Sequence, residues 1–246
     1  MPMKLALWDF DGTLAHRAGM WSGTLVEVAA AEAPHLSLSI DDIRGHLRTG
    51  FPWNRPDEPH PHLADADAWW AALHPYMAAA YERVGVPSDT AAALATKVRE
   101  RYLALDAWRV FDDVTPALEW LTAAGWRHVI VSNHTPELAD LVDGLGIGGH
   151  FLACVNSAVV GYEKPRREIY EAALAAGPGA SQVVMVGDNP VADVQGAAGA
   201  GIPGLLLDRQ AGEPVLGAFR SLAEVADALL AGQWQPHAPV AAARRG

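Results

Sequence analysis

The stretch LALWDFDGT at residues 5–13 decides how the rest of the chain is interpreted. Its first four residues are apolar, and a continuous apolar run of this length is typical of a strand buried inside a parallel sheet. Asp9 and Asp11 follow directly, and Gly12 then allows the chain to turn away from the strand end. The stretch therefore predicts a buried first strand that delivers two carboxylates to one edge of a sheet.

From about residue 107 onward, strand patterns alternate with helix patterns. Strands are expected at 126–131, 151–160, 183–186 and 205–207, and helices at 115–124, 136–145, 165–176, 190–200 and 221–230. Strands that alternate with helices are typical of a parallel sheet covered on both faces. We therefore predict an α/β fold with a Rossmann-like parallel sheet as its core.

Between the first two strands, only helical periodicity recurs, and a loop with four prolines at 51–62 interrupts it. We expect an α/β catalytic core made of residues 1–18 and 107–232, an inserted α-helical cap domain at 19–106, and a flexible tail at 233–246. Ligands of such sheets bind at the carboxyl ends of the strands. An insert that starts there is placed to cover the ligand site like a lid.

Composition excludes several classes of protein. With 50% hydrophobic and 19% charged residues, the chain is unlike a disordered protein. A net charge of −11 argues against nucleic acid and anionic membranes as partners. The single cysteine, Cys154, excludes an intramolecular disulfide, and no apolar segment approaches the ~20 residues that span a bilayer. We expect a cytoplasmic protein, and the oligomeric state stays open.

Polar side chains follow the expected strands at their carboxyl ends. They are Asp9 and Asp11 after the first strand, Ser132 and Asn133 after the second, Lys164 after the third, Asp188 after the fourth, and Asp193 five residues later. Because parallel strands end at one edge of the sheet, these groups are expected to converge on one pocket.

This set of groups is suited to phosphoryl transfer. Asp9 can attack phosphorus, which divides one difficult step into two. Asp9, Asp188 and the backbone carbonyl of Asp11 offer the oxygen ligands that Mg²⁺ prefers. Lys164 and the Ser132 hydroxyl can bind the remaining phosphate oxygens.

Asp11 follows the nucleophile by two residues. There it can protonate the leaving oxygen and later deprotonate the water that hydrolyses the intermediate. The Thr13 side chain is placed to orient Asp11. Ser132 and Asn133 also suit the start of the following helix, and that structural interpretation stays open beside the phosphate-binding one.

Four motifs, DFDGTL at 9–14, VSN at 131–133, GYEKP at 161–165 and GDNPVAD at 187–193, resemble those of the haloacid dehalogenase superfamily in kind and order. The resemblance covers the core, roughly residues 1–18 and 107–230. Because dehalogenating members lack the second aspartate, Asp11 indicates a resemblance to the phosphatase branch.

The resemblance also implies roles for the matched residues. It implies that Asp9 is the nucleophile, Asp11 the acid and base, Asp188 a metal ligand, Ser132, Asn133 and Lys164 the phosphate-binding groups, and Asp193 a supporting acid that acts through water or holds Lys164. The implied cofactor is Mg²⁺, and the implied substrate is a small phosphorylated metabolite.

We therefore predict a Mg²⁺-dependent phosphatase that cleaves a small phosphate monoester through an aspartyl phosphate. A phosphosugar mutase shares Asp9 and Asp11, so that activity stays open. A regulatory module that accepts phosphate without turnover is a third interpretation. Asp11 argues against it, because a long-lived phosphate gains nothing from a neighbouring acid and base.

The predicted cap gives fewer indications. Arg55, on the proline-rich loop, is a candidate for binding a second anionic group of the substrate. A surface loop that packs its own aromatic side chains explains the same stretch equally well. The ten histidines show no spacing typical of a metal site.

Overall fold

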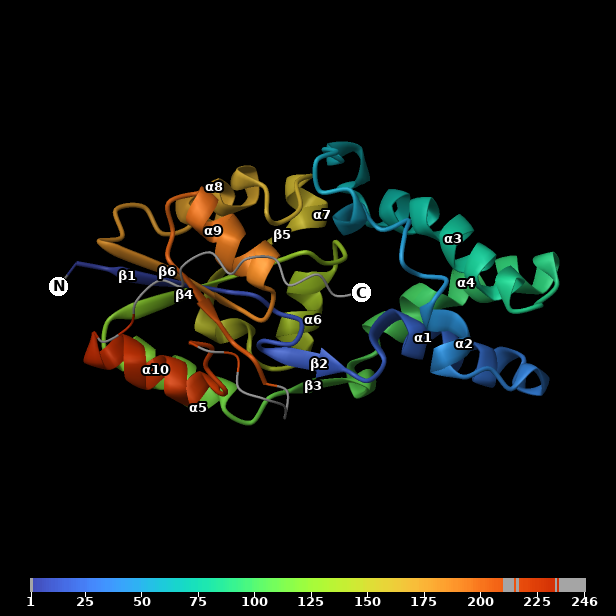
Figure 1. Ribbon diagram of the computed structural model, residues 1–246, viewed down its shortest axis with the longest axis horizontal. Helices are drawn as coiled ribbons and strands as arrows, with labels where there is room; N and C mark the ends of the chain where they lie inside the picture. Colours follow the sequence, from blue (N-terminus) through green and yellow to red (C-terminus); the bar gives the residue numbers. More distant parts are fainter. Residues whose placement is uncertain (1, 210–214, 216, 233, 235–246) are drawn as a thin grey trace.

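The computed structural model describes residues 2–209, 215, 217–232 and 234. Most of the tail predicted at 233–246 therefore lies outside the described residues. Figure 1 shows an α/β part at one end of the long axis and a bundle of helices at the other. Among the described residues, no helix combines the length and the apolar character that a membrane span requires.

Five parallel strands form the main sheet, as predicted. They are β1 (Lys4–Trp8), β4 (Trp126–Ser132), β5 (Phe151–Asn156), β6 (Gln182–Gly187) and β7 (Gly204–Leu206), in the order β5-β4-β1-β6-β7. Leu7 of β1 pairs with Val129 of β4 on one side and with Met185 of β6 on the other. The central place of β1 puts the residues that follow it in the middle of the sheet edge.

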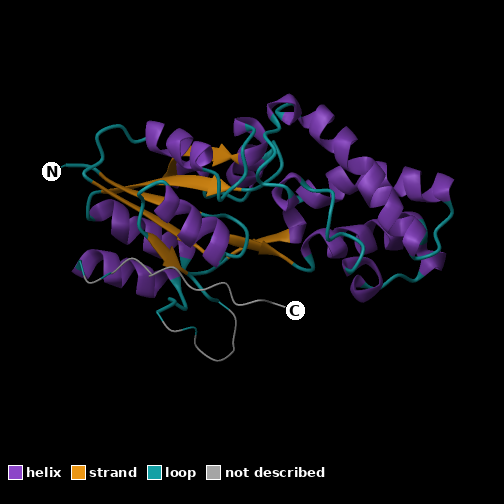
Figure 2. Ribbon diagram, turned by 45° about the horizontal axis from the view of Figure 1, so that its top comes forward, coloured by secondary structure: helices purple, strands orange, loops and turns teal. Residues whose placement is uncertain are grey.

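Helices cover both faces of this sheet, as Figure 2 shows. They are α5 (Val114–Ala123), α6 (Leu138–Gly144), α8 (Arg167–Ala175), α9 (Gly196–Gly199) and α10 (Leu222–Ala231). Side chains alternate between the two faces of a strand. Ala6 and Trp8 accordingly belong to the same buried cluster as the apolar residues of α5 and α10, whereas Leu5 and Leu7 pack with those of α8.

Two short strands connect the sheet to the helical bundle. β2 (Ala15–Arg17) and β3 (Trp108–Val110) pair antiparallel, and the chain between them, residues 18–107, forms the helical insert. These two strands were not predicted, because three residues are too few to show an alternating pattern. The predicted division of the chain into a core domain and a cap domain remains a proposal.

The helical insert has four helices and four single 3₁₀ turns among the described residues. These elements are α1 (Met20–Glu32), η1 (Pro34–Leu36), α2 (Ile40–Arg44), η2 (Pro52–Asn54), η3 (Pro61–Leu63), α3 (Ala66–Arg83), α4 (Ser88–Leu103) and η4 (Leu105–Ala107). α4 packs against both α1 and α3. The proline-rich loop therefore contains two short turns, η2 and η3, where no regular structure was expected.

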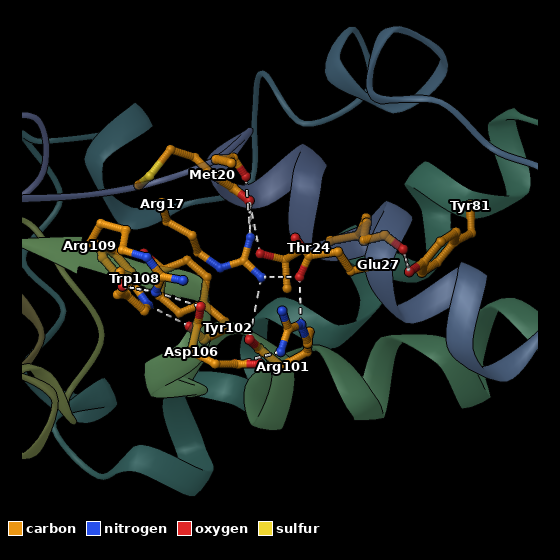
Figure 3. Close-up of polar contacts among 12 residues, drawn as sticks. Arg17, Met20, Thr24, Glu27, Tyr81, Arg101, Tyr102, Asp106, Trp108 and Arg109 are labelled. Atoms are coloured by element: carbon orange, nitrogen blue, oxygen red, sulfur yellow. Dashed lines mark hydrogen bonds and ion pairs between the residues drawn. The ribbon is translucent and has the colours of Figure 1, made fainter. Parts of the chain in front are cut away.

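A buried arginine fixes the stem to the helices of the insert (Figure 3). Arg17, at the end of β2, donates through Nη2 to Glu27 Oε2 at 2.6 Å, and its side chain is only 1% exposed. Arg101 on α4 donates to the same carboxylate oxygen at 2.5 Å. Glu27 on α1 therefore joins β2 and α4 through one shared ion-pair cluster.

Two expected elements differ from the structure. The strand expected at 151–160 ends at Asn156, whose side chain accepts a hydrogen bond from the Val159 amide and so begins the short helix α7 (Ser157–Val160). Lys164 therefore follows a helix and not a strand, contrary to the prediction. The helix expected at 190–200 begins with a π-helical segment, η6 (Pro190–Gln195), before α9.

Candidate active site

A tight turn after β1 sets the position of the two aspartates. The amides of Thr13, Leu14 and Ala15 all donate to the carbonyl of Phe10, so the chain curls back at the strand end. Gly12 has a φ of +75°, and a Cβ there would lie 2.4 Å from Asp188 Oδ2. Only glycine allows both the turn and this close approach.

Asp9 is held through one of its two carboxylate oxygens. The Ser132 hydroxyl donates to Asp9 Oδ1 at 3.0 Å, and Lys164 Nζ donates to the same oxygen at 2.7 Å. These two hydrogen bonds join three predicted site residues that come from distant parts of the chain. Both contacts end on Oδ1, which leaves Oδ2 as the oxygen available to an incoming substrate.

Lys164 also binds Asp193. Its Nζ lies 2.6 Å from Asp193 Oδ1, and the other Asp193 oxygen accepts from the Asn189 amide at 2.9 Å. Although burial alone would lower the pKa of Lys164, the charges of Asp193 and Asp9 raise it above its usual value. The ammonium group therefore stays charged, and Asp193 holds it in place.

Asn133 contacts Lys164 through the backbone. Its Oδ1 accepts from the Lys164 amide at 2.7 Å, and its Nδ2 donates to the Lys164 carbonyl at 3.0 Å. Both ends of the Asn133 side chain are thus engaged with the protein. We therefore expect Asn133 to position Lys164, and not to contact phosphate as the sequence predicted.

Carboxylates crowd at the centre of the sheet edge. One oxygen each from Asp9, Asp188 and Asp193 lies within 4.8 Å of the others. Loss of hydration, and then the charges of Asp9 and Asp193, raise the pKa of Asp188 to about 7. Burial raises the pKa of Asp193 to about 6, against the opposing charge of Lys164.

This crowding fits a divalent cation. Asp9, Asp188 and Asp193 together carry more negative charge than Lys164 compensates, and the ligand atoms that they offer are all oxygens, which suit Mg²⁺. The predicted ligand set contained Asp9, Asp188 and the backbone carbonyl of Asp11. The structure adds the Asp193 carboxylate to this neighbourhood.

The surroundings of the Asp11 carboxyl group favour its protonated form. Its Oδ1 is buried and has no hydrogen-bond partner among the described residues. Burial, followed by the charges of Asp9 and Asp188, raises the pKa of Asp11 well above its usual value. The neutral acid is therefore favoured beside the anionic Asp9.

Thr13 and Arg55 do not join this cluster through their side chains. The Thr13 hydroxyl is buried and has no partner among the described residues, so the expected support of Asp11 is not seen. Arg55 is exposed and pairs with Glu58 at 2.8 Å. It lines a cavity of about 250 Å³ whose lining residues all belong to the helical insert.

Two residues near the site were not foreseen as site residues. Tyr102 of α4 brings its hydroxyl to 3.5 Å from His134 Nε2, and the His134 ring packs edge-on against Phe10. Burial lowers the pKa of His134 to about 4, so this ring is neutral. Burial, and then the charge of Asp11, raise the pKa of Tyr102. Helical periodicity predicted α4 but could not show which side chain faces the sheet.

Comparisons with known proteins identify the family to which this site belongs. The family model described as haloacid dehalogenase-like hydrolase matches residues 3–201. The haloacid dehalogenase-like hydrolase domain-containing protein 3 of Danio rerio is 27% identical, over 87% of this chain and 88% of that protein. The phosphoglycolate phosphatase of Caulobacter vibrioides is 31% identical, over 81% of this chain and 77% of that protein.

Solved structures support the fold. A haloacid dehalogenase-type hydrolase from Bacillus subtilis, solved bound to magnesium, matches with a TM-score of 0.69 and 18% identity, over 93% of this chain and 99% of that chain. The family model covers more than half of the sequence, so the match shows membership of the family as well as the fold. The chain belongs to the haloacid dehalogenase-like hydrolases and is an enzyme of that family.

Proposed function

We propose that the protein is a Mg²⁺-dependent phosphatase that hydrolyses a small phosphate monoester through an aspartyl phosphate on Asp9. One observation carries this proposal: Ser132 and Lys164 both donate to Oδ1 of Asp9, and the buried Asp11 carboxyl group, two residues further on, has an oxygen without a hydrogen-bond partner among the described residues. Relatives named as phosphatases support it, among them the Caulobacter protein and a phosphoserine phosphatase from Thermus thermophilus that is 28% identical over 84% of this chain.

In the first step, Asp9 Oδ2 attacks the phosphorus atom and forms an acyl phosphate bond. The bond from phosphorus to the ester oxygen breaks, and the neutral Asp11 gives its proton to that oxygen. Lys164 and Ser132, already at Oδ1, lie where they can donate to the phosphoryl oxygens. The alcohol leaves, and Asp11 is then a carboxylate.

In the second step, water replaces the alcohol. Asp11 takes a proton from the water, whose oxygen attacks the same phosphorus atom. The bond between phosphorus and Asp9 Oδ2 breaks, so inorganic phosphate leaves and the Asp9 carboxylate is restored. Asp11 is again protonated, and the cycle consumes one water and one ester.

Asp9, Asp188 and the backbone carbonyl of Asp11 are the groups that we expect to hold Mg²⁺. When bound, the ion supplies positive charge that offsets the repulsion between Asp9 and the phosphate. Asp193 contributes mainly by holding Lys164, because both of its oxygens already accept hydrogen bonds from the protein.

A turnover assay tests the proposal against its rivals. The purified protein is incubated with p-nitrophenyl phosphate and Mg²⁺, and a chelator is then added. Steady release of nitrophenol that stops on chelation supports the phosphatase. A single stoichiometric burst indicates a phosphoacceptor module, and activity on sugar phosphates only with a bisphosphate primer indicates a mutase.

The natural substrate requires a second experiment. We propose a small phosphorylated metabolite in the cytoplasm. A panel of phosphorylated metabolites, compared by kcat/KM, identifies the chemical class of the alcohol that leaves in the first step.

A further inference from the structure

The proline-rich loop of the helical insert contacts the α/β part close to Lys164. In Figure 1 this loop lies beside α7, and η3 packs against that helix. The His60 amide donates to the carbonyl of Gly161 at 2.8 Å. A Cβ at Gly161 would lie 2.8 Å from the Pro61 Cα, so the two backbones meet without room for a side chain.

A buried histidine and a buried glutamate face each other at this contact. His60 Nε2 lies 3.0 Å from Glu163 Oε1, and the two side chains are 6% and 1% exposed. The distance is that of an ion pair, although the ring does not have the alignment of a hydrogen bond. Among the described residues, no other donor or cation reaches the Glu163 carboxylate.

A buried carboxylate with a single partner depends on that partner. Among the described residues, His60 is the only side chain that forms a polar contact with the Glu163 carboxyl group. Without His60, this buried polar group would have no partner at all, which is unfavourable. Because His60 belongs to the helical insert, the position of Glu163 depends on the loop being docked.

Glu163 directly precedes Lys164, whose side chain reaches Asp9. Asn133 holds the Lys164 backbone by two hydrogen bonds. The segment 161–164 is thus held from two directions, by the α/β part through Asn133 and by the insert through His60.

We propose that the contact between His60 and Glu163 positions Lys164. The phosphate-binding lysine is then correctly placed only when the proline-rich loop of the insert lies against residues 161–164. The proposal rests on the proposed function only in that Lys164 binds a phosphoryl group. His60 does not touch the reacting atoms in this scheme; it acts through Glu163 on the segment that carries the lysine.

Binding of inorganic phosphate tests this directly, without turnover. In the presence of Mg²⁺, phosphate affinity is measured by titration calorimetry for the wild type, H60A, E163Q and H60A/E163Q. We expect H60A to weaken binding roughly tenfold, within the range of coupling between contacting residues. E163Q should weaken it less, because the amide keeps the size of the side chain and can still contact the His60 ring. The double variant should bind no more weakly than H60A, because the contact between the two side chains is already lost in H60A.

The matched control is His62→Ala, on the same loop. His62 is exposed and, like His60, lines the cavity of about 250 Å³ in the helical insert. Among the described residues, the ion pair with Glu163 is made by His60 and not by His62. Its phosphate affinity should equal that of the wild type. If H60A binds phosphate as tightly as the wild type, or if the two losses simply multiply in the double variant, the pair does not position Lys164.

Hydrogen exchange separates positioning from general destabilisation. We expect H60A to speed exchange at 51–63 and 157–166 and to leave helix α10 unchanged; equal exchange at those two segments in H60A and wild type overturns the docking contact. If the wild type binds phosphate but never turns over p-nitrophenyl phosphate, the proposed phosphatase activity fails. A phosphate affinity that still depends on His60 would then leave this inference standing.

Discussion

Lys164 and Asp9 form a buried ion pair of 2.7 Å, although 155 positions separate them in the sequence. Lys164 lies on the segment that follows β5 and α7, and only β4 separates β5 from β1 in the sheet, so the long lysine side chain can reach the carboxyl end of β1. Asp9 is thereby both fixed in orientation and surrounded by the groups that would receive a phosphate.

Asp9→Asn should abolish turnover of p-nitrophenyl phosphate and preserve the fold. The amide has nearly the same shape and can still accept from Ser132, but it is a far weaker nucleophile. Steady-state kinetics and circular dichroism measure the two properties. Asp140→Asn, an exposed aspartate on α6, is the control and should keep full activity. Retention of more than a few per cent activity in Asp9→Asn would show that Asp9 is not the nucleophile.

Asp11→Asn should lower kcat by roughly 10²–10⁴-fold on an alkyl phosphate, as expected when a general acid and base is lost. The loss should be smaller on p-nitrophenyl phosphate, because nitrophenolate leaves without needing a proton. The comparison of kcat on the two esters measures the acid role. Equal losses on both would assign Asp11 to the hydrolysis step alone.

Mg²⁺ should raise the Tm of the wild type, because an ion that binds only the folded state stabilises it by mass action. Without metal, Asp188→Asn should itself raise the Tm at pH 8. The folded-state pKa of Asp188 is raised to about 7, so above that pH the folded protein carries an unfavourable charge. The stabilisation by Mg²⁺ should shrink in this variant. A thermal melt in chelator and in Mg²⁺ measures both effects, and a lower metal-free Tm for Asp188→Asn would contradict the crowding argument.

Glu27→Gln should lower the free energy of unfolding by about 1–3 kcal/mol. The Arg17 guanidinium is almost completely buried, and Glu27 is its only acidic partner among the described residues. Urea unfolding measures the change. Glu32→Gln, at the exposed end of the same helix, is the control and should change stability little. A loss of stability no larger than that of the control would show that the shared ion pair does not hold the stem.

His128 should contribute a loss of stability as the pH drops from about 6.5 toward 4.5, against the gain that protonation of Asp188 and Asp193 brings over the same range. Trp8 Nε1 donates to His128 Nδ1 at 3.1 Å, and burial lowers the pKa of His128 to about 4. Below a pH of about 6.5, His128 binds a proton in the unfolded chain but stays neutral in the folded protein. Each unit by which the pH drops therefore lowers the free energy of unfolding by at most about 1.4 kcal/mol through this group.

His128→Gln should lose less stability on acidification, or gain more, than the wild type, because the ring that binds a proton only in the unfolded chain is gone. His46→Gln, which replaces an exposed histidine, should leave the slope of stability against pH as it is in the wild type. Urea unfolding at several pH values measures the slope. Parallel curves for His128→Gln and the wild type would remove His128 as a cause.

Several structural features follow from local sequence and were predicted correctly. The apolar run before Asp9 correctly predicted a buried strand, and the alternation after residue 107 correctly predicted the parallel sheet. The strand expected at 151–160 was too long, because the Asn156 side chain caps a helix that begins at the next residue. A short apolar run does not distinguish the last residues of a strand from the first turn of a helix.

Other features depend on contacts between distant residues. The pairing of β2 with β3, the approach of Tyr102 to His134 and the use of Asn133 to hold Lys164 all join segments that are far apart in the chain. Arg55 was chosen as a substrate ligand for its charge, and only the three-dimensional arrangement shows that it pairs with Glu58.

The sequence by itself determined the sheet, its covering helices and which chemical groups follow its strands, because hydrophobic periodicity and turn residues act over a few neighbouring positions. Only the tertiary structure decided that Asp193 holds Lys164 and that His60 reaches Glu163 from the helical insert. Those contacts depend on how whole elements pack, and packing is a property of the folded chain that no short stretch of residues contains.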